Sequence, residues 1–412
     1  MTGSAQSAAR PPLTVVFLSA SANTGGAERV LLDAVAGLVA LSAAVPHVIV
    51  PGTGPVLDEA RAAGAQVTVV ALPQALAAVG DFGRRTPGAL VRVALSLVTR
   101  LPALLWYARQ LRAAVRRARP DVVHSNGLKM HLLSVLVVPS RTAIVWHLHD
   151  YIGQRAMASR LLRMARVRCA VAIANSEDVA ADARSLFGAS PPVEVLLNPV
   201  DLTRFTPTGP VLDLDAAAGM PAAPRDVIRV GLIATFARWK GHRTFLSAMA
   251  RVARVHPVRG YVIGGAIYAT EASQESVEAL RAHACGEGLD GIIGFTGFLP
   301  DTASAMRALD VVVHASTRPE PFGLVIAEAM AVGRSVVTSA SGGAAEIVRA
   351  EDTALTHTPG DADSLAMAIG RLCASTALRG EMGARARMDA ITRFDREPFA
   401  AALAAIYHRL AA

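Results

Sequence analysis

Two glutamates bracket a turn and an apolar helical run in the stretch STRPEPFGLVIAEAMAVG, residues 316–333. Pro321 and Gly323 shape the turn, and Glu328 lies about one and a half turns into the helix that should follow. Carboxylates are good acceptors for vicinal hydroxyls. We therefore expect Glu320 to bind hydroxyls of a sugar and Glu328 to bind those of a ribose. A solvent-facing Glu328 that only favours the helix is the alternative.

A second cluster is the stretch ATFARWKGH, residues 234–242, which follows an apolar run typical of a strand. Arg238 and Lys240 would lie in a loop at the strand end, just before a helix. Two cations there can bind a diphosphate through charge-assisted hydrogen bonds. Two exposed loop charges without a ligand are the alternative.

The stretch SANTGGAERVLL, residues 19–30, carries two glycines between a strand and a helix. Gly25 and Gly26 would let a ligand approach the backbone, and the helix would direct its free N–H groups at that point. The pattern differs from the dinucleotide fingerprint Gly-x-Gly-x-x-Gly. A plain strand-to-helix turn is equally compatible with it.

The stretch WHLHD, residues 146–150, ends another apolar run. His147 and His149 lie two residues apart, so both side chains should project from the same face of the strand. Their clustering favours an active-site role for one of the two, although a structural histidine is the alternative. A third ligand at a suitable spacing is missing, which argues against zinc.

The neighbouring stretch HSNGLKMH, residues 124–131, follows a further strand. We expect this strand end, with Asn126 and Lys129, to form part of the wall of the substrate site.

The elements that must position these residues follow an α/β pattern. Short β-branched runs alternate with longer stretches whose apolar residues recur every three or four positions, which predicts parallel sheets covered on both faces. The predicted strands are residues 14–20, 47–50, 66–72, 121–126, 143–150, 170–176 and 193–200, then 227–236, 259–266, 292–297, 311–316 and 335–340. The proline-rich passage at residues 198–226 reads as a linker between two doubly wound domains. We expect the ligand in a cleft where the carboxyl ends of the two sheets face each other.

Length and composition agree with two large cores. The chain has 412 residues, of which 52% are hydrophobic and 18% charged. The three cysteines are far apart, which fits a reducing cytoplasm and excludes a disulfide framework or structural zinc site. The most membrane-like stretch, residues 89–110, is interrupted by Arg92, Arg100 and Pro102, so we expect no transmembrane helix.

The net charge of +8 is unevenly distributed. Solvated helix faces are the simpler interpretation, and a surface that rests on anionic lipid or meets a phosphorylated acceptor is the alternative. Nucleic acid is disfavoured because aromatic residues are sparse there. The arginines in question are Arg84, Arg85, Arg92, Arg100, Arg109, Arg112, Arg116, Arg117 and Arg119 in one segment, and Arg155, Arg160, Arg163, Arg166 and Arg168 in another.

Together these stretches resemble the retaining glycosyltransferases of family 4, which have two Rossmann-like domains in the arrangement called GT-B. The matching motifs are GGAER (25–29), HD (149–150), NS (175–176), NPVD (198–201), RWKG (238–241), GFLPD (297–301), EPFGLVIAEAMAVG (320–333) and SGGAAEIV (341–348). Two glutamates separated by seven residues are the most specific of these signals.

The resemblance implies a role for each matching residue. Gly26 would donate its backbone N–H to the donor phosphate, while Arg238 and Lys240 would hold the diphosphate and support the leaving group. His149 would lie close to the reacting sugar, with His147 as the competing assignment. The remaining donor-side residues would be Glu320 and the backbone of Phe322, Gly323 and Leu324 at the sugar, Glu328 at the ribose, and the backbone of Gly297 and Phe298 near the base.

The resemblance also implies a domain plan: an acceptor-binding domain at residues 1–203, a nucleotide-sugar-binding domain at 204–385 and a C-terminal segment at 386–412 that returns to the first domain. The predicted activity is retaining, metal-independent transfer of a sugar from a nucleoside-diphosphate sugar to a hydroxyl acceptor, without a cofactor, in the cytoplasm or at the inner face of the membrane. A non-catalytic nucleotide-sugar-binding protein and a sugar-nucleotide epimerase are the alternatives. A phosphorylase is disfavoured because only Lys129 and Lys240 could hold pyridoxal phosphate.

Overall fold

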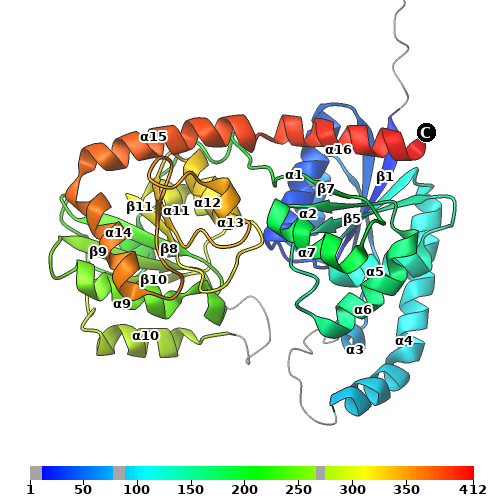
Figure 1. The fold of residues 1–412 in the computed structure, drawn as a ribbon, viewed down its shortest axis with the longest axis horizontal. Coiled ribbons are helices and arrows are strands. Elements are labelled where there is room, and N and C mark those ends of the chain that lie inside the picture. Colours follow the sequence, from blue (N-terminus) through cyan, green and yellow to red (C-terminus); the bar gives the residue numbers. More distant parts are fainter. Residues whose placement is uncertain (1–11, 78–88, 266–273) are drawn as a thin grey trace, which may run out of the picture. The chain divides into compact units, whose positions relative to one another are not determined.

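The computed structural model describes residues 12–77, 89–265 and 274–412, and it divides into two compact units (Figure 1). Unit 1 comprises Met1–Ala174, Ala180–Leu196 and Arg396–Ala412, and unit 2 comprises Asn175–Val179 and Leu197–Asp395. Arg84 and Arg85 of the first arginine segment lie outside the described residues.

Unit 1 is built on a seven-stranded parallel sheet in the order β3-β2-β1-β4-β5-β6-β7. Its central strands consist almost wholly of buried residues, as expected for a sheet covered on both faces. The strands are β1 (Leu13–Ser19), β2 (Ala44–Val50), β3 (Gln66–Val69), β4 (Val122–Asn126), β5 (Ala143–Leu148), β6 (Val171–Ala174) and β7 (Val193–Val195).

Helices between these strands complete unit 1. They are α1 (Gly26–Ala40), α2 (Pro55–Ala62), α3 (Gln74–Ala77), α4 (Ala89–Ala118), α5 (Leu128–Val137), α6 (Ala156–Ala165) with the 3-10 turn η1 (Arg166–Arg168), and α7 (Glu177–Phe187), of which residues 177–179 are grouped with unit 2. The C-terminal helix α16 (Arg396–Ala411) packs on α1. Close packing requires Gly37, where a Cβ atom would lie 2.6 Å from the Cβ atom of Ala400.

Unit 2 repeats the plan with a six-stranded parallel sheet in the order β10-β9-β8-β11-β12-β13. Its strands are β8 (Ile228–Ile233), β9 (Val258–Ile263), β10 (Ile293–Gly297), β11 (Val311–His314), β12 (Ser335–Thr338) and β13 (Leu355–Thr356). Its helices are α8 (Leu214–Ala217), η2 (Arg238–Lys240), α9 (His242–Val252), α10 (Val277–Gly286), α11 (Thr302–Arg307), α12 (Leu324–Ala331), α13 (Ala344–Ile347), α14 (Ala362–Ala374) and α15 (Thr376–Arg393).

In each sheet the order in which successive strands are added reverses once, between β1 and β4 in unit 1 and between β8 and β11 in unit 2. Neighbouring loops diverge at such a switch point, which leaves room for a ligand at the carboxyl ends of the strands. The predicted α/β class with two parallel sheets is confirmed. The two-residue strand β13 is an addition that the sequence pattern did not predict.

The expectation that residues 198–226 form a linker is wrong, because this segment packs on unit 2. Val200, Phe205 and Leu214 are buried in its core. The boundary therefore lies at Leu196 and Leu197 rather than at residue 203. Proline and polar residues gave the segment the composition of a linker, but the few apolar residues between them suffice to hold it on the sheet.

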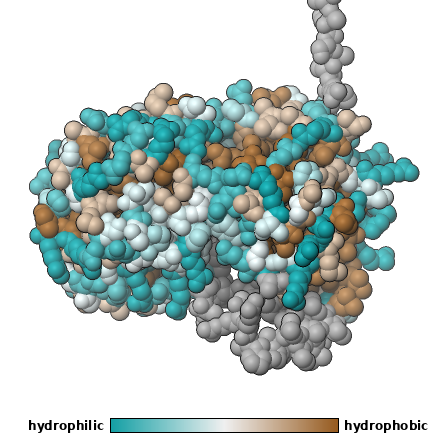
Figure 2. All heavy atoms as spheres, in the orientation of Figure 1, coloured by the Kyte–Doolittle hydropathy of each residue, from teal (hydrophilic) through white to brown (hydrophobic). Residues whose placement is uncertain are grey.

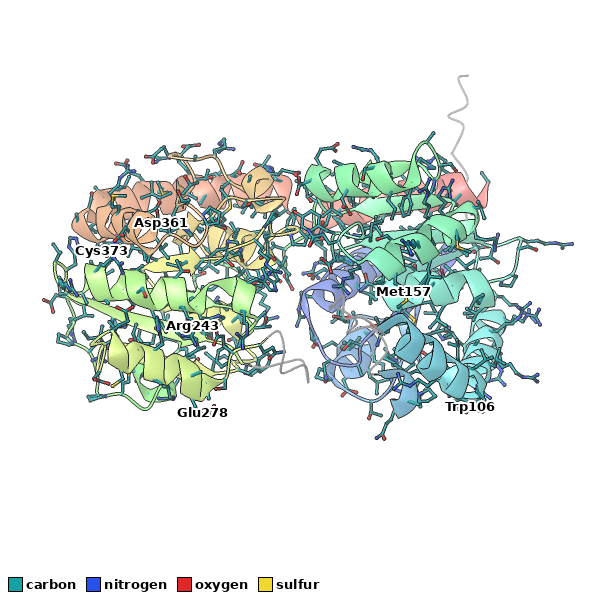
Figure 3. All side chains as sticks on the ribbon, turned by 60° about the horizontal axis from the view of Figure 1, so that its bottom comes forward. Trp106, Met157, Arg243, Glu278, Asp361 and Cys373 are labelled. Carbon is teal, nitrogen blue, oxygen red and sulfur yellow. The ribbon has the colours of Figure 1, made fainter. Side chains whose placement is uncertain are left out.

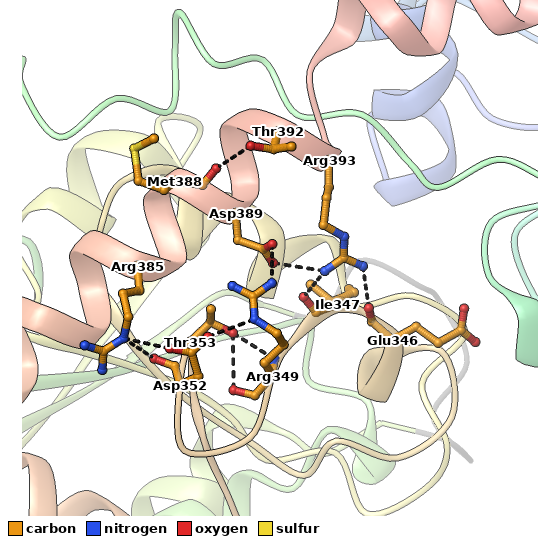
Figure 4. A network of polar contacts seen from close by, with 10 residues as sticks. All are labelled: Glu346, Ile347, Arg349, Asp352, Thr353, Arg385, Met388, Asp389, Thr392 and Arg393. Atoms are coloured by element: carbon orange, nitrogen blue, oxygen red, sulfur yellow. Dashed lines mark hydrogen bonds and ion pairs between the residues drawn. The ribbon is translucent and has the colours of Figure 1, made fainter.

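The chain returns to unit 1 at Arg396 rather than at residue 386, because α15 is held on unit 2. Asp389 of α15 is buried and accepts hydrogen bonds from Arg349 at 2.6 Å and from Arg393 at 3.0 Å (Figure 4). Arg393 also donates to the carbonyl oxygen of Ile347 at 2.8 Å, so α15 is fastened to the loop after α13.

Asp215 holds the segment of residues 198–226 on the sheet of unit 2. Its buried carboxylate accepts hydrogen bonds from Arg259 and from the Tyr261 hydroxyl, each at 2.6 Å, and Arg229 lies at 3.5 Å. Asp215→Ala should lower the free energy of unfolding by about 3 kcal/mol, because it leaves the half-buried Arg259 and the buried Tyr261 hydroxyl without their acceptor. Urea denaturation measures this loss. Asp213→Ala, which removes only an exposed helix cap, should cost about 1 kcal/mol; equal losses would contradict this assignment.

Candidate functional site

The two cations predicted to bind a diphosphate, Arg238 and Lys240, lie at the switch point of unit 2. Arg238 and Lys240 form the turn η2 after β8, and Glu320 follows the adjacent strand β11. Thr317 donates its backbone N–H to the carbonyl oxygen of Trp239 at 2.7 Å, which ties the two loops together. Residues 80 positions apart in the sequence thus meet because β8 and β11 are hydrogen-bonded neighbours.

Lys240 and Glu320 form an ion pair. The Lys240 ammonium donates to both carboxylate oxygens of Glu320, at 2.9 and 2.7 Å, and lies 4.1 Å from the centroid of the Trp239 ring. Burial by itself would raise the pKa of Glu320, but the Lys240 charge and the hydrogen bond from His314 outweigh it and hold the pKa well below its ordinary value. Glu320 is therefore an anion at neutral pH, and its charge is compensated by Lys240.

Three residues that the sequence analysis missed support this carboxylate. His314 and Ser316 donate to the Oε2 atom of Glu320 at 3.1 and 2.9 Å, and the other ring nitrogen of His314 bonds to the Thr338 hydroxyl at 3.1 Å. His314 is the last residue of β11, so a histidine at the end of a predicted strand was the available signal. The sequence contained no comparable signal for Thr338, because it ends the strand β12 and its contact with His314 depends on the pairing of the two strands.

Gly241 and Gly323 let the site loops pack closely. Gly241 has a φ of 75°, and a Cβ atom there would lie 1.9 Å from the carbonyl oxygen of Ala315. Gly323 has a φ of 91° and begins α12 without a side-chain cap. Both positions require a residue without Cβ, which explains the glycines of two motifs by backbone geometry.

The other predicted donor-side residues of unit 2 lie on η2, on α12 and the loop before it, and at the end of β10. Glu328 is half-buried on α12, and Arg238 is exposed on η2. The Phe322 ring is buried against Phe394, so only its backbone can serve a ligand. Leu324 opens α12, and Gly297 and Phe298 are exposed at the end of β10.

In unit 1 the two glycines differ. Gly25 donates its backbone N–H to the Glu28 carboxylate at 3.3 Å, so this N–H is used within the protein. Gly26 is exposed at the start of α1, and a Cβ atom there would meet nothing within 4 Å. Packing within the protein therefore does not explain the glycine at position 26. The hydroxyl of Thr24 and the guanidinium of Arg29 both bind Glu59, which holds this loop in place.

His149 follows β5 and is half-buried. Its Nε2 atom lies 2.5 Å from the Oδ1 atom of Asn126, which ends the adjacent strand β4. The Nδ2 atom of Asn126 donates to the carbonyl oxygen of Ala27 in α1 at 3.0 Å. The structure thus brings together Asn126, His149 and the helix that begins at Gly26. Lys129 is half-buried on α5.

His147 lies beneath His149 and is fully buried. The two rings are in tilted contact, with centroids 4.1 Å apart, and the Nδ1 atom of His147 lies 3.2 Å from the Nε2 atom of His124. His124 in turn bonds to the buried hydroxyl of Tyr407 on α16 at 2.8 Å. The sequence analysis missed His124 and Tyr407; no pattern connects Tyr407 with residues 283 positions away.

Metal ligands are not grouped in the described part of the chain: nowhere in it do three or more His, Cys, Asp or Glu side chains lie where they could hold an ion. The stretches DLD at 213–215 and DAD at 361–363 are used otherwise. Asp213 and Asp361 cap helices, and Asp215 binds Arg259.

The buried histidines of unit 1 predict a pH dependence of stability. Burial lowers the pKa of His124 and His131 to about 3, and also lowers those of His147 and His149. Unfolded histidines titrate near pH 6.5, so the unfolded chain binds more protons below that pH, and each such histidine destabilises the fold by about 1.4 kcal/mol per pH unit as the pH falls.

The melting temperature should therefore fall between pH 6.5 and 5, a window in which carboxylates remain ionised. Calorimetry across this range measures the slope, and His131→Gln should reduce it. Replacement of the half-buried His408 on α16 by Gln is the control. An unchanged slope in His131→Gln would contradict a neutral buried His131.

Two family models match this chain. A family model described as Glycosyltransferase Family 4 matches residues 24–204, and one described as Glycosyl transferases group 1 matches residues 225–375. The first match runs from the residues before α1 past β7, and the second from the residues before β8 to the end of α14.

Two relatives are similar in sequence. The lipopolysaccharide core biosynthesis glycosyltransferase LpsE of Rhizobium meliloti (strain 1021) is 31% identical over 196 residues, 48% of this chain and 54% of that protein. The lipopolysaccharide core biosynthesis mannosyltransferase LpcC of Rhizobium leguminosarum bv. viciae is 31% identical over 219 residues, 53% of this chain and 60% of that protein. The chain thus matches just over half the length of these relatives.

Solved structures share the fold. The crystal structure of Anabaena HepE in complex with UDP and glucose has a TM-score of 0.77 at 24% identity, with 96% of this chain and 99% of that chain covered. Sucrose-phosphate synthase from Thermosynechococcus elongatus has a TM-score of 0.74 at 20% identity, with 97% and 99% covered. The resemblance is confirmed: this chain belongs to the family 4 glycosyltransferases, and its two Rossmann-like units are those of the GT-B fold.

Proposed function

We propose that this protein transfers a sugar, with retention of anomeric configuration, from a nucleoside-diphosphate sugar to a hydroxyl acceptor. The observation that carries the proposal is the Lys240–Glu320 pair at the switch point of unit 2, next to the helix that presents Glu328. A compensated cation–carboxylate pair can bind a diphosphate and a polyol side by side, since the cation attracts phosphate and the carboxylate accepts from hydroxyls.

In this scheme Arg238 and Lys240 stabilise the charge that develops on the departing nucleoside diphosphate, which is electrostatic catalysis. Glu320 orients Lys240 and accepts from the transferred sugar, and Glu328 accepts from the ribose. The exposed N–H group of Gly26 would bind the donor phosphate, and His149 would face the reacting sugar. No separate nucleophilic carboxylate and no metal are proposed.

UDP is the first nucleotide to test, because HepE, which shares the fold, was crystallised with UDP and with UDP-glucose. A protein that binds the nucleotide sugar without turning it over is the alternative from another class. An assay for sugar transfer or slow hydrolysis of the donor separates the enzyme from the binding protein, since the binding protein would show neither reaction. In an enzyme, Lys240→Ala would abolish both reactions.

UDP should raise the melting temperature in the presence of EDTA, and Glu328→Ala should remove most of this increase. A ligand at 100 times its dissociation constant contributes about 2.7 kcal/mol of apparent stability. Differential scanning fluorimetry with UDP, GDP, ADP and dTDP, each with EDTA and with magnesium, measures the effect. Glu278→Ala, an exposed glutamate on α10, is the matched control.

Stabilisation that requires magnesium would contradict the metal-independent scheme. An unaltered response in Glu328→Ala would contradict the assignment of this glutamate to the ribose.

We further propose that the acceptor is presented at an anionic lipid surface, because unit 1 exposes apolar residues among arginines. Met157, Leu161 and Met164 line one face of α6, and Met164 is 74% exposed. Leu105 and Trp106 are exposed on α4, with Arg109 and Arg112 on the following turns. Figure 2 shows hydrophobic surface at the lower right, over the part of unit 1 that holds α4, and Figure 3 labels Trp106 and Met157.

These two helices both pack on α5, and neither contains an acidic residue. Leu136 of α5 is also exposed, and its carbonyl oxygen accepts from Arg112 at 3.4 Å. Apolar side chains surrounded by arginines suit the interface of an anionic bilayer. Within the described residues, no helix has the length and hydropathy to cross a membrane, so the proposed contact is peripheral.

The protein should co-sediment with vesicles that contain an anionic phospholipid more than with purely zwitterionic vesicles, and added salt should weaken the binding. Met164→Glu should reduce the bound fraction several-fold, because it places a charge in the apolar stripe. Met367→Glu on α14 of unit 2, where the methionine is 67% exposed, is the matched control. Equal loss in both variants, or no preference for anionic lipid, would contradict the proposal.

A further inference from the structure

Asn126 connects the first turn of α1 with His149. Its side chain is fully buried at the end of β4, and both of its polar atoms are bonded: Nδ2 to the Ala27 carbonyl oxygen at 3.0 Å, and Oδ1 to the Nε2 atom of His149 at 2.5 Å. In the β4–β5 pairing Asn126 lies opposite His147, which is two residues before His149 in the chain. This register brings the Asn126 amide within reach of the His149 ring.

The partners determine the orientation of the amide. The Ala27 carbonyl oxygen can only accept a hydrogen bond, so the atom that faces it must be the NH₂ group of Asn126. The remaining amide oxygen can only accept. The Nε2 atom of His149 must therefore carry a proton, whether the ring is neutral or charged.

In the neutral ring, a proton on Nε2 leaves the Nδ1 atom with its lone pair. Burial lowers the pKa of His149, which keeps the ring neutral near pH 7. In this tautomer the Nδ1 atom of the half-buried His149 can accept a hydrogen bond from a hydroxyl group but cannot donate one to a carbonyl or phosphate oxygen.

The surroundings of His149 favour the neutral ring. The ring of His147 contacts that of His149 at a tilt, with 4.1 Å between centroids, and the Nδ1 atom of His147 is bonded to His124, which binds Tyr407 of α16. His131 lies in the same group of histidines and bonds to the Ser125 hydroxyl. The adjacent Asp150 is exposed and pairs with Arg155 at 2.5 Å.

We propose that Asn126 is a positioning residue that holds His149 as the Nε2–H tautomer, so that Nδ1 accepts from a substrate hydroxyl. The inference rests on the proposed function only for the identity of the substrate. The tautomer itself follows from the contacts of Asn126 and can be tested without any substrate.

The decisive measurement is the two-bond ¹H–¹⁵N spectrum of the full chain with ¹⁵N-labelled histidine, in which His149→Gln identifies the signals of His149. We expect the Nε2–H pattern for His149 at pH 7. His47, which bonds to the Thr68 hydroxyl on another edge of the sheet, serves as an internal reference. The Nδ1–H pattern for His149 in the wild-type protein would overturn the proposal, and this readout does not depend on whether a variant of Asn126 folds.

Asn126→Asp then tests the dependence on the amide. A carboxylate opposite Nε2 favours the imidazolium, so the titration midpoint of His149 should rise by at least about one pH unit. Gln110→Glu on the exposed side of α4 makes the same change of charge and should leave it unchanged. An unshifted His149 in folded Asn126→Asp protein would overturn the proposal.

Activity separates this inference from the proposed function. If transfer occurs, the acid limb of its pH–rate profile should move upward in Asn126→Asp by the shift seen in the spectrum, which a merely structural loss would not produce. The expected tautomer without any transfer would support the role of Asn126 and refute the transferase.

Discussion

The site in unit 2 depends on one ion pair, between Lys240 and Glu320. Each charge alone would be costly to bury, because Glu320 is only 7% exposed and accepts three donors besides its backbone contacts. Together they form the polar centre on which the proposed donor site is based. The pair forms only because β8 and β11 are adjacent at the switch point of the sheet, which brings the turn η2 next to the loop before α12. The rest of unit 2 serves to hold these two loops in register.

Backbone geometry supports the pair as much as side chains do. The left-handed residue Gly241 passes so close to the Ala315 carbonyl that no side chain fits, and Gly323 opens α12 in the same way. His314 and Ser316 donate hydrogen bonds to the Oε2 atom of Glu320, which also accepts from Lys240. A ligand would thus meet a preformed arrangement, and little reorganisation would be needed on binding.

The candidate site residues of unit 1 are joined by hydrogen bonds between neutral side chains, whereas those of unit 2 centre on an ion pair. Its polar chain runs from Tyr407 through His124 to His147, beneath His149, and a separate contact through Asn126 reaches the start of α1. The C-terminal helix therefore contributes to the surroundings of the active-site candidate from the far end of the chain. Its position beside α1 depends on Gly37, whose missing side chain lets the helices approach.

The sequence alone determined the fold class, most strands and the chemical character of the site, because alternating apolar runs and short motifs are local signals. Local patterns also located Lys240, Glu320 and His149 at strand ends. They failed for residues 198–226, where composition indicated a linker although Phe205 and Asp215 fix the segment to unit 2. Only the tertiary structure decided that Lys240 pairs with Glu320, that Asn126 bonds to His149, and that Tyr407 reaches His124. These contacts join strands and helices that are distant in sequence, so their geometry is set by strand order and helix packing, which no local pattern encodes.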